Sequence, residues 1–347
     1  MRALVKSARG PGHVQVRDMP VRSPGHDELL IKIKYCGICG TDLHIAQDEF
    51  PNDPPVIMGH EYCGAIVEVG EGVQDRWSVG QRVVGELHTG ACGECELCQA
   101  GKPHICDAKL ALGSRHDGAF AEYLTLPAWL AHPIPDGVPW EVAGVTEPFA
   151  IAAHCLAERG QVDHPRSILI SGVATMGLMS TLWAGRLGAE DIIVSGTDLD
   201  QAERFSLAKA MGANRLVNVQ HGDLAEVVMD RTQGYGVDVW VECSGATAAI
   251  NSGLELVKKT GKLIMIGLTG PETVHVPWNT LLYREIDAYG CFSSPPSSWE
   301  LALAAEVEEA DRLRKLVTAI LPLEAWEEGF EMLRRGQGVK ILLDLEG

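Results

Sequence analysis

The sequence has little positive charge. Its 347 residues include 29 Lys and Arg against 47 Asp and Glu, which gives a formal net charge of -18. Nucleic acids and anionic membrane surfaces bind basic protein faces, so this balance argues against either as a partner. The acidic balance is typical of a soluble protein and does not identify a substrate.

The chain also lacks the hydrophobic segments that direct a protein to a membrane. Residues 1–16 contain no apolar core of a secretory signal. The stretch between Arg166 and Arg186 is uncharged, but glycine, serine and threonine interrupt it, and it divides into a strand, a turn and a helix. We therefore expect a cytoplasmic protein with reduced thiols, in which clustered cysteines favour metal binding over disulfides.

No internal repeat, coiled-coil heptad or low-complexity tract is evident, and the length suggests two domains at roughly 100–200 residues each. Residues 1–148 contain short β-like runs separated by Gly and Pro, which predict an irregular, mainly β domain. The expected strands of this domain include Leu29–Lys34, Gly64–Val69, Arg82–Gly85 and Ala121–Leu126.

Residues 149–290 have a different sequence pattern, in which apolar runs alternate with helical stretches. This rhythm is typical of an α/β domain with a doubly wound parallel sheet. The expected strands are Ser167–Val173, Ile192–Thr197, Arg215–Val219, Val237–Ser244 and Lys262–Leu268. The helices between them are expected to begin near Met176, Asp200, Asp223 and Ala246.

Residues 291–347 carry a further helix, Ala325–Arg335, and a last strand, Val339–Asp344. We expect this segment to rejoin the first domain, which makes the α/β domain an insertion. The charged run Glu306–Lys315 is expected to be a solvent-exposed helix face.

Four of the ten cysteines form a C-x2-C-x2-C-x7-C pattern, consisting of Cys92, Cys95, Cys98 and Cys106. Short spacings let successive thiolates surround one ion, and a fourth thiolate closes a tetrahedral shell with no open position. The pattern therefore predicts a structural zinc ion in a lobe at about residues 88–107. An iron–sulfur cluster is the alternative, but the spacing differs from that of ferredoxins.

A second group of metal-binding residue types lies upstream. Cys39 belongs to the segment Gly37–His44, and His60 and Glu61 follow in a Gly-His-Glu-Tyr step. Cys, His and carboxylate are a mixed zinc set, and three protein ligands would leave one position for water or substrate. The spacing alone leaves open that these are packed residues without a metal.

Taken in order, these motifs resemble the zinc-dependent medium-chain alcohol dehydrogenase family, and within it the polyol (sorbitol) and L-threonine dehydrogenases. The resemblance covers nearly the whole chain: Cys39-Gly40-Thr41-Asp42, Gly59-His60-Glu61, the four cysteines, Gly118–Tyr123, Glu147-Pro148 and a glycine-rich turn at residues 172–177. It implies a Rossmann-type sheet inserted in a GroES-like catalytic domain that carries the zinc lobe.

The resemblance also implies roles for individual residues. Cys39 and His60 would be ligands of a catalytic zinc, Glu61 would be a ligand in some states, and Glu147 would be either a ligand or the holder of the zinc-bound water. Thr41 would pass on the substrate proton, and His44 would relay it. Zinc would stabilise the alkoxide of a secondary alcohol, which then gives hydride to a nicotinamide ring.

The glycine-rich turn follows the strand Ser167–Ser171, and it departs from G-x-G-x-x-G because Ala174 takes the middle position between Gly172 and Gly177. We expect the pyrophosphate at the N-terminus of the helix near Met176, slightly shifted by the alanine methyl.

The usual acidic position for the ribose falls on Gly196. Asp198 or Asp200 could reach the ribose, or Arg204 could bind a 2′-phosphate. The acidic loop favours NAD over NADP. Gly267, Leu268 and Ser293 resemble residues at the nicotinamide end.

The preferred hypothesis is a dehydrogenase for a polyol, sugar or related secondary alcohol, with two zinc ions per chain. L-threonine is the alternative substrate, because Ile45 and Tyr62 are similar to residues of the threonine enzymes. A non-catalytic protein that binds zinc and nucleotide on the same fold is the alternative from another class. The resemblance further implies a homotetramer or homodimer.

Overall fold

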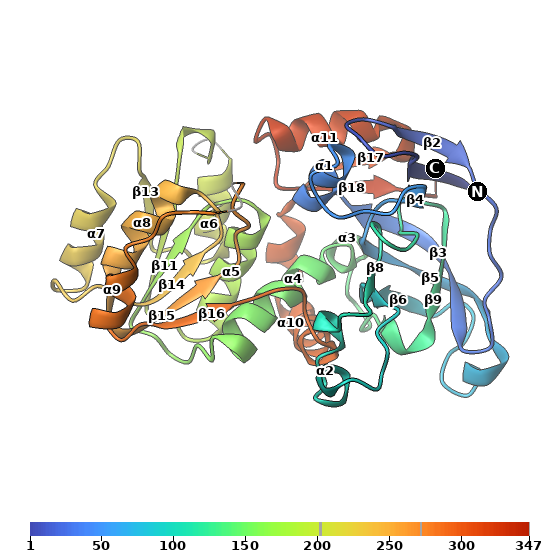
Figure 1. Cartoon of the computed structure of the whole chain (residues 1–347), viewed down its shortest axis with the longest axis horizontal. Coiled ribbons are helices and arrows are strands. Elements are labelled where there is room, and N and C mark those ends of the chain that lie inside the picture. The colour runs from blue at the N-terminus through green and yellow to red at the C-terminus, as the bar shows by residue number, and fades with distance from the viewer. Residues whose placement is uncertain (201–202, 271–272, 347) are drawn as a thin grey trace. The chain divides into compact units, whose positions relative to one another are not determined.

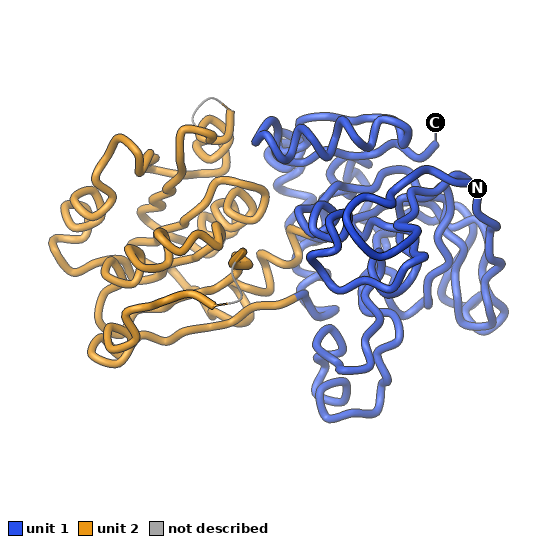
Figure 2. Tube along the Cα trace, turned by 45° about the horizontal axis from the view of Figure 1, so that its top comes forward, with its two compact units in different colours: residues 1–147, 293–347 blue, residues 148–292 orange. Residues whose placement is uncertain are grey.

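The main sheet of the catalytic unit is built from two distant parts of the chain. In the computed structural model, which describes residues 1–200, 203–270 and 273–346, unit 1 comprises Met1–Glu147 and Ser293–Gly347, and unit 2 comprises Pro148–Phe292. Figure 2 shows unit 1 in blue and unit 2 in orange.

Unit 1 contains a seven-stranded sheet with the order β10-β6-β5-β3-β18-β17, and β9 also pairs with β3. Its strands are β3 (Glu28–Gly37), β5 (Glu61–Val69), β6 (Arg82–Gly85), β9 (Tyr123–Pro127), β10 (Ala131–Pro133), β17 (Val317–Pro322) and β18 (Lys340–Asp344). In β3, Ile31 and Ile33 are buried while Lys32 and Lys34 are not, as the two-residue period of a strand requires. Figure 1 shows β18 among the strands of the first segment, and its Leu343 pairs with Cys36 of β3.

A smaller sheet and several helices complete unit 1. The sheet has the order β2-β1-β4, formed by β1 (Arg2–Lys6), β2 (Val14–Asp18) and β4 (Val56–Ile57), and a further pair consists of β7 (His88–Thr89) and β8 (Leu110–Ala111). The helices are α1 (Gly40–Ala46), α2 (Glu96–Gln99), α3 (Trp140–Ala143), α10 (Pro296–Arg314) and α11 (Trp326–Arg334). Helix α4 (Thr146–Ala153) begins at the end of the first segment of unit 1.

Unit 2 is a parallel sheet with the order β13-β12-β11-β14-β15-β16. Its strands are β11 (Ser167–Ser171), β12 (Asp191–Gly196), β13 (Arg215–Asn218), β14 (Val237–Glu242), β15 (Val257–Met265) and β16 (Asp287–Gly290). Its helices are α5 (Thr175–Arg186), α6 (Arg204–Met211), α7 (Leu224–Arg231), α8 (Thr247–Leu256) and α9 (Trp278–Tyr283). The chain runs from β11 to the β13 edge and returns to β14, so the carboxyl ends of β11 and β14 form the switch point where such sheets bind ligands.

The expected fold class, a doubly wound parallel sheet inserted in a mainly β catalytic domain, is confirmed. Some boundaries differ from expectation. Helix α6 begins at Arg204 rather than Asp200, and residues 201–202 of the expected helix lie outside the described residues. Strand β15 runs from Val257 to Met265 rather than from Lys262 to Leu268.

The charged run Glu306–Lys315 at the end of α10 is exposed at most of its charged residues, as expected, but the expectation is wrong for Glu306. Glu306, the first residue of the charged run on α10, is fully buried because α10 turns this side toward the unit 1 interior beside Thr146. None of the described helices is both long enough and apolar enough to cross a lipid bilayer.

Candidate metal centres and coenzyme turn

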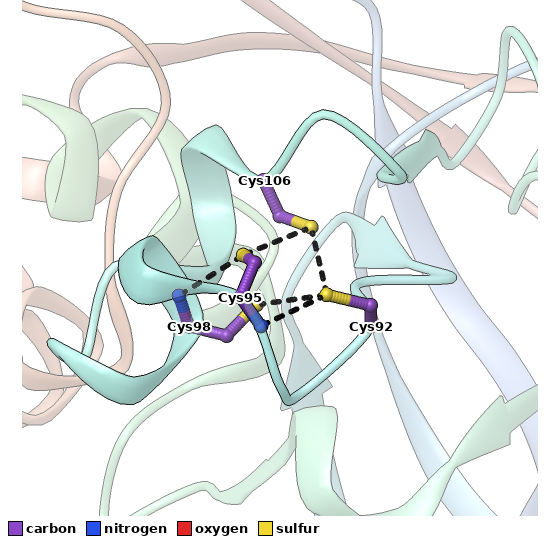
Figure 3. A group of neighbouring side chains, drawn as sticks. All are labelled: Cys92, Cys95, Cys98 and Cys106. Atoms are coloured by element: carbon purple, nitrogen blue, oxygen red, sulfur yellow. Dashed lines mark hydrogen bonds between the residues drawn. The ribbon is translucent and has the colours of Figure 1, made fainter.

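The four cysteines of the lobe converge on one point (Figure 3). Their Sγ atoms are 4.0 Å apart for Cys92 and Cys98, 3.8 Å for Cys95 and Cys106, and 3.7 Å for Cys92 and Cys106. A tetrahedral zinc ion with Zn–S bonds of about 2.3 Å separates its sulfurs by about 3.8 Å, so the spacing fits zinc. All four ligand positions of such an ion would be thiolates, which leaves no place for a substrate.

Local backbone geometry forms this lobe. Cys95 is the N-cap of α2, and its Sγ accepts a hydrogen bond from the Cys98 amide at 3.4 Å. The Cys95 amide donates to the Sγ of Cys92 at the same distance. Amide donors to sulfur stabilise thiolates, the form that binds metal.

The second cluster joins the end of β3 to the start of β5. Cys39 is the N-cap of α1, two residues after β3; His60 immediately precedes β5, and Glu61 is the first residue of that strand. Gly37 pairs with Glu61 in the sheet register, which brings the two segments together. The ligand atoms of Cys39, His60 and Glu61 all lie within 4.8 Å of one another. Thiolate, imidazole and carboxylate at this separation fit a zinc ion that keeps an open position.

Gly37 is a steric requirement of this arrangement. A Cβ atom at residue 37 would collide with Oε2 of Glu61 and would lie 3.2 Å from Cδ of Lys340. Any larger residue would therefore push the Glu61 carboxylate out of its place beside Cys39.

Asp42 orients both neighbouring ligands. Its Oδ2 accepts a hydrogen bond from the Cys39 amide at 2.8 Å, and its Oδ1 lies 3.5 Å from Nδ1 of His60. Burial lowers the pKa of His60, but the charge and hydrogen bonding of Asp42 outweigh this and raise the pKa well above its ordinary value. A carboxylate on one ring nitrogen fixes the tautomer and directs the other nitrogen toward a metal.

Glu61 is held by a cation that the sequence reasoning missed. Lys340 Nζ lies 2.6 Å from Oε2 and 2.8 Å from Oε1 of Glu61, and it donates to the carbonyl oxygen of Ile38 at 3.2 Å. Both side chains are buried. Burial lowers the pKa of Lys340, but Glu61 and Cys39 outweigh it and raise the pKa above its ordinary value. The only sequence signal was a lysine next to the apolar run of the last strand.

The other expected catalytic residues have different surroundings. Thr41 Oγ1 lies 3.6 Å from the Sγ of Cys39. His44 is exposed on α1, with its Nδ1 2.8 Å from Oε2 of Glu49. Glu147, in the first turn of α4, is buried, but its carboxylate is not part of the cluster of ligand atoms. Burial and the nearby Glu61 raise the pKa of Glu147 to about 7, against the opposing charges of His60 and two lysines.

The glycine-rich turn lies at the switch point of unit 2. Gly172 has φ 100°, and a Cβ there would lie 3.1 Å from Cα of Ser244 after β14. A Cβ at Gly177 would overlap the carbonyl oxygen of Gly172, so this glycine lets the helix approach the turn closely. Ala174 is exposed at the N-cap of α5, and α5 begins at Thr175, one residue before Met176.

The two aspartates after β12 have different surroundings. Asp200 is buried and accepts hydrogen bonds from the Thr197 amide at 2.9 Å and from Arg204 Nη1 at 3.0 Å. Asp198 is half exposed, and its Oδ1 accepts from Asn218 and His221 at 2.7 Å each. The Asn218 hydrogen bond lowers the pKa of Asp198, so this aspartate carries a negative charge at neutral pH.

The residues expected at the nicotinamide end follow β15 and β16. A Cβ at Gly267 would collide with the Gly245 amide, so this position brings two loops together. Leu268 is exposed. Ser293 has a positive φ of 58° and lies at the start of the second segment of unit 1.

The sequence matches two family descriptions. Residues 25–136 match the alcohol dehydrogenase GroES-like domain, and residues 175–308 match zinc-binding dehydrogenases. The chain is 34% identical over 343 residues to sorbitol dehydrogenase of Halalkalibacterium halodurans, covering 99% of both chains. The chain belongs to the zinc-dependent medium-chain dehydrogenase family.

Other members of the family differ in their named substrates. D-arabitol-phosphate dehydrogenase of Enterococcus avium is 33% identical, with 99% of this chain and 97% of the relative covered. L-threonine 3-dehydrogenase of Proteus mirabilis is also 33% identical, with 99% of each covered. Among solved structures, a zinc-binding dehydrogenase of Sinorhizobium meliloti bound to NADP superposes with a TM-score of 0.87 at 30% identity, covering 99% and 98%. The dehydrogenase described here is accordingly an NAD(P)-dependent enzyme that acts on alcohols.

Proposed function

We propose that this dehydrogenase interconverts a secondary alcohol of the polyol or sugar type and its ketone, with NAD as the preferred coenzyme. The observation that supports this most directly is the cluster of Cys39, His60 and Glu61, whose ligand atoms lie within 4.8 Å of one another. Relatives named for sorbitol and arabitol phosphate agree with this substrate class.

Two zinc ions per chain are part of the proposal. Cys92, Cys95, Cys98 and Cys106 would hold the structural ion, and Cys39, His60 and an acidic side chain would hold the catalytic ion. When bound, the catalytic zinc supplies a Lewis acid that lowers the pKa of a coordinated alcohol. Because Lys340 engages both oxygens of Glu61, Glu61 would ligate only after leaving the lysine. Glu147, a buried acid whose carboxyl is coupled electrostatically to Glu61 and His60, is the second candidate.

The chain's own residues would handle the proton. Oxidation breaks the substrate C–H bond with both electrons passing to the nicotinamide, and the hydroxyl proton must leave separately. Thr41, beside Cys39, would accept this proton and pass it toward His44, three residues later on the same side of α1. His44 is exposed, so it can deliver the proton to water.

The preference for NAD is proposed from the loop after β12. A 2′-phosphate near Asp198 would meet a carboxylate whose pKa is held low. Arg204, the alternative partner for that phosphate, is hydrogen-bonded to Asp200. Gly172, Ala174, Met176 and Gly177 would bind the pyrophosphate, and Gly267, Leu268 and Ser293 would lie near the nicotinamide.

We further propose a cytoplasmic homotetramer or homodimer, on the family resemblance. L-threonine remains the second candidate substrate, favoured by three L-threonine dehydrogenase relatives at 33–34% identity. A non-catalytic zinc- and nucleotide-binding protein is the remaining alternative.

A substrate screen with metal analysis tests these proposals. We expect oxidation of polyols or sugars with NAD, loss of activity after zinc removal, and recovery after zinc is restored. Cys39→Ala should leave one zinc and no turnover, whereas Cys98→Ser should lose the lobe's zinc. Oxidation of L-threonine alone would support the second candidate. Full activity in Cys39→Ala would refute the catalytic assignment.

A further inference from the structure

The turn after helix α1 places a carboxylate beside His44, the proposed proton relay. The C-cap of α1 is Gln47. The Glu49 amide donates to the His44 carbonyl oxygen at 2.8 Å, and the amide of Asp48 donates to the carbonyl oxygen of Ile45 at 3.0 Å. These two hydrogen bonds, with the left-handed φ of 63° at Asp48, form a Schellman motif. The motif returns the second residue after the C-cap to the last turn of the helix, so Glu49 lies beside His44.

The side chain of Asp48 holds this turn in place. Aspartate is one of the few residue types other than glycine that adopt a left-handed conformation, because its short polar side chain forms local hydrogen bonds. Its Oδ2 accepts from the Gly10 amide at 2.8 Å, and its Oδ1 accepts from Nδ2 of Asn52 at 2.9 Å. Asn52 is itself buried. Two other segments therefore fix the backbone that positions Glu49.

The side chains of Glu49 and His44 also meet. Oε2 of Glu49 lies 2.8 Å from Nδ1 of His44. A carboxylate can only accept a hydrogen bond, so Nδ1 of the neutral ring carries the proton and Nε2 keeps its lone pair. The two side chains are 56% and 62% exposed, and such a pair contributes little to stability. The contact therefore matters more for the state of the ring than for the fold.

Helix α1 connects this ring to the candidate metal centre. Thr41 Oγ1 lies 3.6 Å from Sγ of Cys39. His44 follows Thr41 by three residues, which puts both side chains on one face of the helix. A proton that leaves the Thr41 hydroxyl needs a lone pair to accept it, and the ring with its proton on Nδ1 offers one at Nε2. The opposite tautomer has an N–H at Nε2 and cannot accept a proton there.

We propose that Glu49 is a positioning residue of the proton relay, which holds His44 in the tautomer that accepts a proton at Nε2. In this step the Nε2 lone pair bonds to the arriving proton, the resulting imidazolium gives one proton to water, and no electrons are exchanged. This inference rests on the proposed function and adds a residue to its proton path. Glu49 acts through His44 and takes no part in hydride transfer.

The kinetic test uses D-sorbitol and NAD with the zinc-loaded enzyme and measures the rate of NADH formation in the first turnover. Glu49→Ala should lower this rate about 3- to 10-fold, less than the roughly 100-fold that a positioned acid or base itself supplies, because water replaces part of the hydrogen bond. The KM for D-sorbitol should stay nearly unchanged. Adding Glu49→Ala to His44→Ala should cause no further loss. Asp27→Ala, which removes a carboxylate 2.9 Å from the exposed ring of His26, is the matched control and should behave as wild type.

Nitrogen NMR of the histidine rings reads the tautomer directly and needs no turnover. At a pH of about 9 an ordinary imidazole is neutral, and the signals of His44 are those that disappear in His44→Ala. In the wild-type enzyme the proton of this ring should lie on Nδ1. In Glu49→Ala the spectrum should move toward the mixture of tautomers that an imidazole has in water.

Three results would overturn the proposal: a wild-type His44 ring with its proton on Nε2, an unchanged first-turnover rate in Glu49→Ala, or a loss from Glu49→Ala that persists in the His44→Ala background. A wild-type rate in His44→Ala would instead refute the relay in the proposed function. If D-sorbitol is not oxidised, the proposed function fails for this polyol, and the NMR spectra still decide whether Glu49 holds the tautomer.

Discussion

Lys340 and Glu61 form a buried ion pair, with Nζ 2.6 Å from Oε2 and 2.8 Å from Oε1. The lysine comes from the last strand of the chain and the glutamate from β5, with β3 lying between the two strands in the sheet. A buried pair contributes little net stability, but an unpaired buried charge is costly. The pair therefore makes the C-terminal segment part of the candidate metal centre.

Lys340→Met should leave the Glu61 carboxylate buried without its cation. Removing one partner of a buried pair costs about 3–5 kcal/mol, so we expect a fall in Tm of several degrees in the apo enzyme. The double variant Glu61→Gln/Lys340→Met should be more stable than the sum of the single changes predicts, and differential scanning calorimetry of all four proteins measures this coupling. Additive losses would show that the pair is not coupled as the geometry requires.

Gly37→Ala should disturb the catalytic metal site and leave the lobe intact. A Cβ at residue 37 collides with the Glu61 carboxylate, whereas a Cβ at Gly40 meets no atom within 4 Å. We expect Gly37→Ala to bind zinc weakly at the Cys39 cluster and to keep the four-cysteine ion, while Gly40→Ala keeps both. Elemental analysis after dialysis against a weak chelator measures the zinc content. Equal zinc content in the two variants would contradict the steric argument.

Glu306 should make the stability of the enzyme depend on pH. Burial raises its pKa from 4.5 to about 8, so in this window the folded state holds a proton that the unfolded state releases. Stability should therefore fall as the pH rises from about 5 to about 8, by up to about 1.4 kcal/mol per pH unit from this group. Glu306→Gln, which stays neutral, should gain stability over wild type as pH rises. If the difference in unfolding free energy between wild type and Glu306→Gln were the same at pH 5.5 and at pH 8, this prediction would be refuted.

Asp198→Ala should weaken the preference for NAD. The change removes a carboxylate that is charged at neutral pH and stands after β12. We expect the ratio of kcat/KM for NAD over NADP to fall about tenfold, equivalent to about 1.4 kcal/mol. Asp230→Asn, on the exposed side of α7, is the control and should leave the ratio unchanged. If the ratio were unchanged in Asp198→Ala, the selection of NAD over NADP would be assigned to Gly196 or Asp200 instead.

The sequence alone was sufficient to predict those features that depend on residues close together in the chain. Cys92, Cys95 and Cys98 lie within one short loop, and their separation in sequence already limits their separation in space. The alternation of apolar runs and helical stretches likewise predicted the parallel sheet, because its strands are buried on both faces.

Long-range pairing set the limits of this prediction. No local pattern states that Gly37 pairs with Glu61 or that β18 returns beside β3, since both depend on strands joined by distant turns. The burial of Glu306 was missed for a similar reason, because charge alone does not show which side of α10 faces the interior.

The sequence by itself determined the fold class, the four-cysteine motif and the residue types of a second metal cluster, because these follow from local spacing and apolar periodicity. Only the tertiary structure decided which charges meet in that cluster. Lys340 is remote in sequence from Glu61, and the fold brings its ammonium group onto the Glu61 carboxylate. In a chain with an excess of acidic residues, one of the lysines is thus buried at the candidate metal centre.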